Sequence, residues 1–209
     1  MYPYGFKLNQ VLKSNMDNET KNLLDQIKAY QPFNEQEEKD KELFIKWLES
    51  GVDVFERTNE IAHFTATSWI VNKSRTKVLM AYHNLFKTFA WLGGHADGEK
   101  DMLKVAIKEM QEESGIKNYK ILSEDIFTLE TLCVRGHEKR GKYVPTHLHL
   151  NVTYLFEVDE NEPIRIKEDE NSAIGWIEVD KIKDTCKKES WVVERIYSKI
   201  TQKINTGNY

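Results

Sequence analysis

The sequence predicts an α/β fold in which a mixed sheet lies between helices, with a helical extension at the N-terminus. Segments rich in β-branched and aromatic residues begin at His63, whereas the residues before them have helical periodicity. The later strands and helices interleave without the regular alternation of a doubly wound parallel sheet. We therefore expect two parts, a helical extension over residues 1–58 and one α/β domain over residues 59–209.

The extension is expected to form two helices. The first is indicated by "NETKNLLDQIKAY", which places apolar residues at i, i+1, i+4 and i+7 after a cap at Asn18. The second is indicated by "NEQEEKDKELFIKWLES", and Gly51 follows it as a stop signal. Pro32 separates the two, so the pair forms a helical hairpin. Two interpretations are open: a cap over a substrate or a homodimer partner, and an extension that only packs against the domain.

The α/β domain is expected to contain at least six strands and two long helices. The strands are indicated by "HFTATSWIV", "TKVLMAYH", "TFAWL", "IFTLETLCV", "THLHLNVTYLFEV" and "AIGWIEV". One helix follows Gly93-Gly94, and the other is indicated by the C-terminal segment "ESWVVERIYSKITQKI". We therefore expect helices on both faces of the sheet.

The composition excludes several classes of protein. A formal net charge of −4 gives no basic surplus for nonspecific nucleic-acid binding. No window approaches the roughly 20 apolar residues of a membrane span, and "MYPYGFKLNQVLKSN" lacks the pattern of a secretory signal. With 2 cysteines, a disulfide framework is not expected. These observations predict a cytoplasmic protein without a nucleic-acid or membrane partner.

The segment "GGHADGEKDMLKVAIKEMQEESGI" carries the clearest chemical signal. Glu109, Glu112 and Glu113 stand at i, i+3 and i+4, so they share one side of the predicted helix. Carboxylates that close repel one another unless a cation lies between them, and hard ions such as Mg²⁺ or Mn²⁺ prefer oxygen ligands. The alternative is a solvated acidic helix face.

The same residues resemble a Nudix box, the pattern G-x5-E-x7-R-E-U-x-E-E-x-G-U in which U is a bulky aliphatic residue. The pattern extends from Gly94 to Ile116 without a gap. It departs at Lys100, where the first glutamate is expected, and at Lys108, where the arginine is expected. The resemblance implies a Nudix-type α/β/α sandwich and a pyrophosphohydrolase. Such an enzyme cleaves a diphosphate linkage between a nucleoside and another moiety, with Mg²⁺ or Mn²⁺ as cofactor.

The resemblance also implies the roles of particular residues. Glu109, Glu112 and Glu113 would bind the metal, with the carbonyl of Gly93 as a further ligand. One of Glu112, Glu113 and Glu170 would take the proton from the attacking water. Glu170 lies in "EDENSAIGWIEV", which resembles the acidic loop of the family before a strand that contains tryptophan; its alternative is a solvated loop.

Lys100 and Lys108 replace the glutamate and the arginine that form a pair in the family. There, the arginine and the first glutamate of the box are thought to pair and to orient the ligand carboxylates. Lys108 and Lys100 cannot pair with each other, so Lys108 is expected to contact another carboxylate: Glu99, Asp101 or Glu112.

Three histidines and one arginine are predicted to bind substrate. His147 and His149 alternate on one strand and share a face, where they would bind phosphate, act as acid or base, or hold a metal. His95 follows the glycine pair, and Arg135 opens the basic loop "RGHEKRGKY". The alternatives are structural histidines and a solvated loop. His63, at a strand start, is expected to be structural.

Two rival functions remain open. A regulatory Nudix domain would bind a nucleotide without turnover, which the departure at Lys100 makes conceivable. An enzyme like isopentenyl-diphosphate isomerase shares the fold but needs a pocket cysteine. Cys133 lies on a predicted strand without a motif of that enzyme. A search for cleavage products among nucleotide diphosphates separates these functions.

Overall fold

The computed structural model describes residues 16–85, 87–139, 141–169 and 171–207. The chain divides into two compact units. The first contains the described residues up to Thr65 together with His95–Met102 and Leu129–Val152. The second contains Ala66–Gly94, Leu103–Thr128 and the described residues from Thr153 onward.

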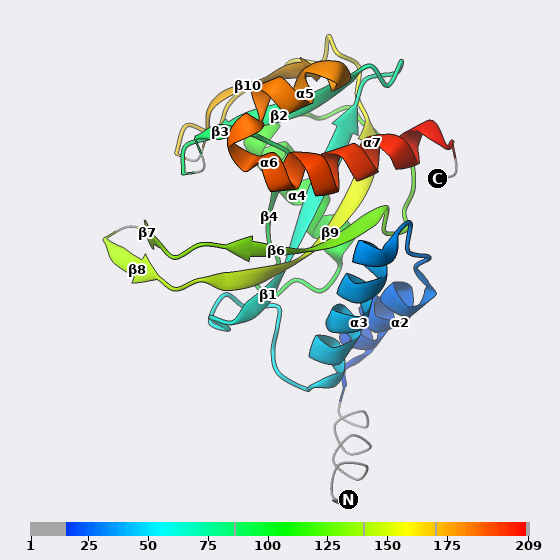
Figure 1. Ribbon diagram of the computed structural model, residues 1–209, viewed down its shortest axis with the longest axis vertical. Coiled ribbons are helices and arrows are strands. Elements are labelled where there is room, and N and C mark those ends of the chain that lie inside the picture. The colour runs from blue at the N-terminus through cyan, green and yellow to red at the C-terminus, as the bar shows by residue number, and fades with distance from the viewer. Residues whose placement is uncertain (1–15, 86, 140, 170, 208–209) are drawn as a thin grey trace, which may run out of the picture. The chain divides into compact units, whose positions relative to one another are not determined.

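The order of elements matches the expected interleaving of helices and strands (Figure 1). The helices are α2 (Asn18–Ala29), α3 (Glu35–Glu49), α4 (Met102–Ser114), α5 (Ile182–Thr185), α6 (Ser190–Val192) and α7 (Ser198–Asn205). Short helical turns are η1 (Val179–Lys181), η2 (Lys187–Glu189) and η3 (Val193–Tyr197). The strands are β1 (Ala62–Val71), β2 (Lys77–His83), β3 (Thr88–Ala90), β4 (Leu92–His95), β5 (Lys120–Ile121), β6 (Thr128–Val134), β7 (His137–Lys139), β8 (Lys142–Val144), β9 (His147–Glu157) and β10 (Asn171–Glu178).

The main sheet is mixed, as the sequence predicts. Its central order is β10-β2-β1-β9-β5. β1 and β9 run parallel, because Leu148 N donates to Ile61 O at the start of both strands and Val158 N donates to Val71 O at their ends. β2 pairs antiparallel with β1, β3 and β10, and β5 pairs antiparallel with β9. The starts of β1 and β9 therefore lie side by side.

Helices cover both faces of the sheet in the second unit. The hydroxyl of Ser68 on β1 donates to Ala106 O of α4 at 3.0 Å. The next side chain on the same strand, Trp69, is fully buried and lies 5.2 Å from the ring of Tyr197 in η3. Successive side chains of a strand point to opposite faces. The expected sandwich of helices around a mixed sheet is confirmed.

The N-terminal helices form the predicted hairpin in the first unit. Asp17, rather than Asn18, caps α2 by accepting a hydrogen bond from Thr20 N at 2.9 Å. The hairpin packs on its own unit: the rings of Phe44 and Phe64 are 5.5 Å apart, and Asp40 accepts a hydrogen bond from Thr131 N. The boundary after residue 58 and a role in capping substrate or a homodimer stay predictions.

None of the helices that the structure describes is both long enough and apolar enough to cross a lipid bilayer.

Candidate functional site

Helix α4 and the glycines before it bring the predicted metal ligands Glu109 and Glu113 against the backbone of β4. A Cβ atom on Gly94 would lie 2.3 Å from Cδ of Glu109, so this carboxylate occupies the space that a side chain would fill. Gly115, with φ of +73°, adopts the left-handed conformation just after the helix, and its N–H donates to Gln111 O. The structure therefore explains both glycines of the box: Gly94 leaves space for the Glu109 carboxylate, and Gly115 adopts the left-handed conformation after the helix.

Glu113 is held by hydrogen bonds on both of its oxygens. Its Oε2 accepts from Gly93 N at 3.0 Å, and its Oε1 accepts from Asn171 Nδ2 at 3.3 Å. The side chain is buried, with 5% of its surface exposed. Asn171 was not among the predicted site residues, although it follows Glu170 directly. The sequence gives no signal for this contact, which depends on where β10 starts.

Glu109 and Glu112 contact lysine ammonium groups. Lys108 Nζ lies 3.1 Å from Glu109 Oε1 and 3.7 Å from Glu112 Oε1, while Lys167 Nζ lies 3.7 Å from Glu112 Oε2. Burial raises the pKa of Glu109 above its ordinary value, and the ion pair with Lys108 opposes that rise. Glu112 is one of the three carboxylates predicted to contact Lys108, and that contact is present.

Lys100 occupies the position of the first glutamate of the box and contacts a different part of the chain. Its ammonium lies 2.6 Å from Oδ2 of Asp17, the residue that caps α2, and 5.3 Å from the centre of the Phe55 ring. Through its hydrogen bond, Lys100 lowers the pKa of Asp17. The residue that departs from the box therefore ties the helical extension to the α3–β1 connection and the loop before α4.

The three box glutamates have the donor chemistry of a hard divalent ion, but their oxygens do not converge on one point. In the parts of the chain that are described, the group of candidate ligands that does converge consists of His63, His147 and His149. The carboxylates instead contact Lys108, Lys167 and Gly93 N. The glutamates fit Mg²⁺ or Mn²⁺ by ligand type.

Two predicted site residues are not placed against these carboxylates. Glu170 lies outside the described residues. Arg135 follows β6 with an exposed side chain, and its carbonyl accepts from Nδ1 of His137 at 3.0 Å. A role for either residue in catalysis or substrate binding stays a prediction.

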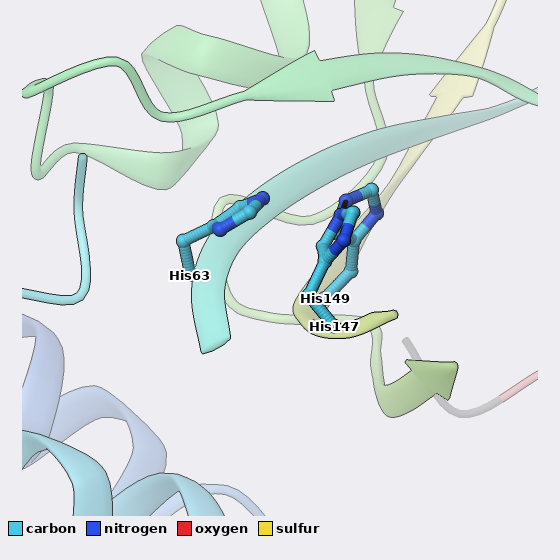
Figure 2. Close-up of side chains that lie close together, drawn as sticks. All are labelled: His63, His147 and His149. Carbon is cyan, nitrogen blue, oxygen red and sulfur yellow. Dashed lines mark hydrogen bonds between the residues drawn. The ribbon is translucent and has the colours of Figure 1, made fainter. Parts of the chain in front are cut away.

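The histidines form a cluster at the start of β1 and β9 (Figure 2). Ring centres are 4.9 Å apart for His63 and His147, 5.0 Å for His63 and His149, and 5.0 Å for His147 and His149. His95 adds its ring at 4.8 Å from that of His149. The cluster exists because β1 and β9 run parallel, so that their first residues meet at one end of the sheet.

Two of these rings have a defined tautomer. His63 Nδ1 lies 2.9 Å from Asn59 O, and His147 Nδ1 lies 2.8 Å from Pro145 O. Because a carbonyl only accepts, each Nδ1 carries the proton and each Nε2 presents a lone pair. Nε2 of His63 is buried without a hydrogen-bond partner, which costs about 1–3 kcal/mol in a folded protein.

Burial favours the neutral form of His95 and His149. It lowers the pKa of both side chains to about 2, and neighbouring positive charge adds to the effect. Neutral rings attract a phosphate group weakly, whereas a neutral imidazole nitrogen is a good ligand for a transition metal. Substrate binding by His95, His147 and His149 stays a prediction, and the metal interpretation has the stronger physical support.

Sequence reasoning treated His63 as structural. The only signal was its place at a strand start, which His147 shares. The sequence does not say that the two strands are neighbours, or that they run parallel.

Comparisons with known proteins agree with the fold and the box. A family profile described as the NUDIX domain matches residues 62–198, more than half of the 209 residues. No curated protein gave a significant match. The chain therefore belongs to the Nudix family of hydrolases.

Two solved structures resemble this chain at low sequence identity. A NUDIX-family hydrolase from Clostridium perfringens has a TM-score of 0.50 and 19% identity, over 70% of this chain and 98% of that one. An Ap4A hydrolase from C. elegans, in a binary complex, has a TM-score of 0.49 and 20% identity, over 69% of this chain and 96% of that one. At 19% identity the likeness to the first structure establishes the fold alone.

Proposed function

We propose that this protein hydrolyses a diphosphate linkage in a nucleoside diphosphate joined to another moiety, and that it depends on Mg²⁺ or Mn²⁺. Membership of the Nudix family supports the reaction class. The observation that carries the proposal is the approach of two buried glutamates of α4 to the glycine turn. Glu113 accepts a hydrogen bond from Gly93 N, and Glu109 fills the space beside Gly94.

Glu109, Glu112, Glu113 and the carbonyl of Gly93 would hold the metal in this proposal. When bound, such ions offset the charge of a diphosphate and lower the pKa of a water molecule. The three carboxylates supply formal negative charge that the lysines only partly offset. A divalent cation would take the place of the Lys108 and Lys167 ammonium groups, which lie 3.1–3.7 Å from the carboxylate oxygens.

Glu112 is the best-placed proton acceptor among the described glutamates of the box. Glu113 already accepts hydrogen bonds on both oxygens, and Glu109 is buried next to Gly94. Glu112 keeps 44% of its side chain exposed and is held only by lysines at 3.7 Å. It can therefore turn toward a water and receive its proton.

Glu113→Gln tests the proposal. The change keeps a hydrogen-bond acceptor for Gly93 N but removes the negative charge. A metal contribution of several kcal/mol to the transition state would then be lost, which is a fall of roughly 1000-fold in kcat/KM. The assay uses nucleotide sugars, dinucleoside polyphosphates, NADH, ADP-ribose and nucleoside triphosphates with Mg²⁺ or Mn²⁺, and it measures released phosphate and cleaved products.

A matched control is Glu124→Gln, which removes one carboxylate from an exposed position outside the box. Its turnover is expected to equal that of the wild type. Equal turnover of Glu113→Gln and the wild type would contradict the ligand assignment. If no compound in the panel is cleaved, while some of them raise the melting temperature, the protein is a binding module and the hydrolase proposal is wrong.

A further inference from the structure

We propose that His63, His147 and His149 form a binding site for a transition-metal ion of the Zn²⁺ class, with an open fourth position. The site goes beyond the proposed hydrolysis. Its ligands belong to the first unit, whereas the box glutamates belong to the second. It also takes a different kind of ion, since imidazole nitrogen favours zinc-like metals and carboxylate oxygen favours Mg²⁺.

The first argument is the convergence of the ligand atoms. One ligand atom from each of the three histidines lies within 4.8 Å of the other two. Nε2 of His147 and Nε2 of His149 are 3.2 Å apart. Two nitrogens bound tetrahedrally at 2.0–2.1 Å from zinc are about 3.4 Å apart, so this pair already has the separation of two ligands. Small rotations of the His63 side chain would close the third side (Figure 2).

The second argument is the support behind the ligands. Histidines that bind metal almost always donate their other ring N–H to a carbonyl, a carboxylate or water. His63 donates to Asn59 O and His147 donates to Pro145 O, both through Nδ1. These bonds keep Nε2 of both rings unprotonated, and Nε2 of His147 lies 3.2 Å from Nε2 of His149. Two of the three rings therefore already have the tautomer of a ligand that binds through Nε2.

The third argument is the orphaned nitrogen of His63. Its Nε2 is buried and has no hydrogen-bond partner, although buried polar groups nearly always have one. A metal ion would satisfy that nitrogen. As the rings are arranged, Nε2–H of His149 donates to Nε2 of His147; to bind the ion through Nε2, His149 would carry this proton on Nδ1 instead.

The open fourth position follows from burial. His63 and His147 are buried, whereas His149 is half-buried, so solvent approaches the cluster from the side of His149. Three protein ligands with a fourth position for water is a common arrangement in zinc sites. The ion would also join the first residues of β1 and β9.

The experiment is a Co²⁺ titration of the full-length protein after treatment with a chelator, in the presence of excess Mg²⁺. Tetrahedral Co²⁺ with nitrogen ligands absorbs visible light far more strongly than octahedral Co²⁺ with oxygen ligands. We expect one equivalent of strongly absorbing Co²⁺, displaced by Zn²⁺. His63→Gln and His147→Gln should each weaken binding by at least about tenfold, because even the loss of a residue that only orients a ligand costs that much.

Two controls locate the ion. His137→Gln is the same substitution in the same unit, on a ring 6.3 Å from that of His147 but outside the ligand group, and it should bind Co²⁺ as the wild type does. Glu113→Gln should also keep the absorption, even though hydrolysis is expected to fall. The proposal and the proposed function can therefore fail separately.

Three results would overturn the site: a weak octahedral spectrum in the wild type, equal binding by the wild type and the histidine variants, or loss of Co²⁺ in Glu113→Gln alone. Circular dichroism identifies any variant that does not fold. His149→Gln, at a half-buried position, then provides the test, and wild-type affinity in that variant would count against the site. NMR of the histidine rings can also identify the ligand atom. If His63 and His147 keep their Nδ1 protons when Zn²⁺ is bound, Nε2 is the atom that binds the ion.

Discussion

The histidine cluster and the box glutamates are both candidate metal sites, and they are built in opposite ways. The histidines come from two strands that are far apart in the sequence, yet their nitrogens already converge. The glutamates come from one helix with motif spacing, yet their carboxylates contact Lys108, Lys167 and the backbone of Gly93.

The difference has a physical origin in charge. Neutral imidazoles can approach one another without electrostatic repulsion, and burial favours the neutral form of His149. Carboxylates repel one another, and here they contact lysine ammonium groups and a backbone N–H. Neutral histidines can therefore converge on their own, whereas glutamates need positive charge between them.

The first prediction concerns the glycine pair. In Gly94→Ala the new Cβ would meet the end of the Glu109 side chain at 2.3 Å, so the carboxylate moves while the backbone stays. A displacement of about 1 Å at a catalytic group can reduce the rate about 100-fold. In Gly93→Ala the Cβ would meet Ala66 O at 2.5 Å, which is backbone.

We therefore expect Gly94→Ala to lose turnover and keep its stability, and Gly93→Ala to lose about 1–3 kcal/mol of unfolding free energy. Urea unfolding and kcat/KM measure the two effects. The reverse pattern would show that the Glu109 carboxylate is not positioned by Gly94.

The second prediction concerns the stability of the metal-free protein at acid pH. His95 and His149 have pKa values of about 2 in the fold, against 6.5 in the unfolded chain. As the pH falls below about 6.5, the unfolded chain takes up protons that the folded cluster does not, so the free energy of unfolding falls. Each histidine contributes a slope of about 1.4 kcal/mol per pH unit.

Urea unfolding at several pH values between 4.5 and 7, with a chelator present, measures this slope. His149→Gln should flatten it by one histidine's contribution, about 1.4 kcal/mol per pH unit. An unchanged slope in His149→Gln would mean that His149 is protonated in the fold.

The smallest effects are expected from the two lysines that depart from the box. Lys108→Met removes the cation beside Glu109, so the pKa of that carboxyl rises further and the acidic limb of kcat/KM moves to higher pH. Because Lys108 is 55% exposed, solvent screens its charge and the expected shift is small. Lys100→Met removes a pair with the exposed Asp17 and should lower stability by about 1 kcal/mol or less.

The pH profile of kcat/KM and the midpoint of urea unfolding separate the two variants. Lys100→Met should leave the acidic limb in place. A shift of equal size in both variants would show that Lys100 also acts on the box carboxylates.

The sequence predicts most of the local structure because local structure depends on near neighbours. The spacing of Glu109 and Glu113, the glycine turn and the end of α4 at Gly115 are all local features, and the mixed sheet with helices on both faces agrees with the expectation. The cap of α2 was displaced by one residue, since Asp17 and Asn18 are both good caps and only the contact with Lys100 favours Asp17.

The partners of the box residues required the tertiary structure. Asn171 donates a hydrogen bond to Glu113, which lies 58 positions earlier in the sequence. Lys100 donates one to Asp17, which lies 83 positions earlier. Neither contact follows a spacing that a helix or a strand imposes.

The family, the fold class and the helix that carries the glutamates can be predicted from motif spacing, local periodicity and the order of segments along the chain. The parallel pairing of β1 and β9 is visible only in the three-dimensional fold. That pairing places His63 beside His147 and His149, and it turns a residue predicted to be structural into a candidate ligand. The register between distant strands depends on the packing of the whole sheet, which no local pattern encodes.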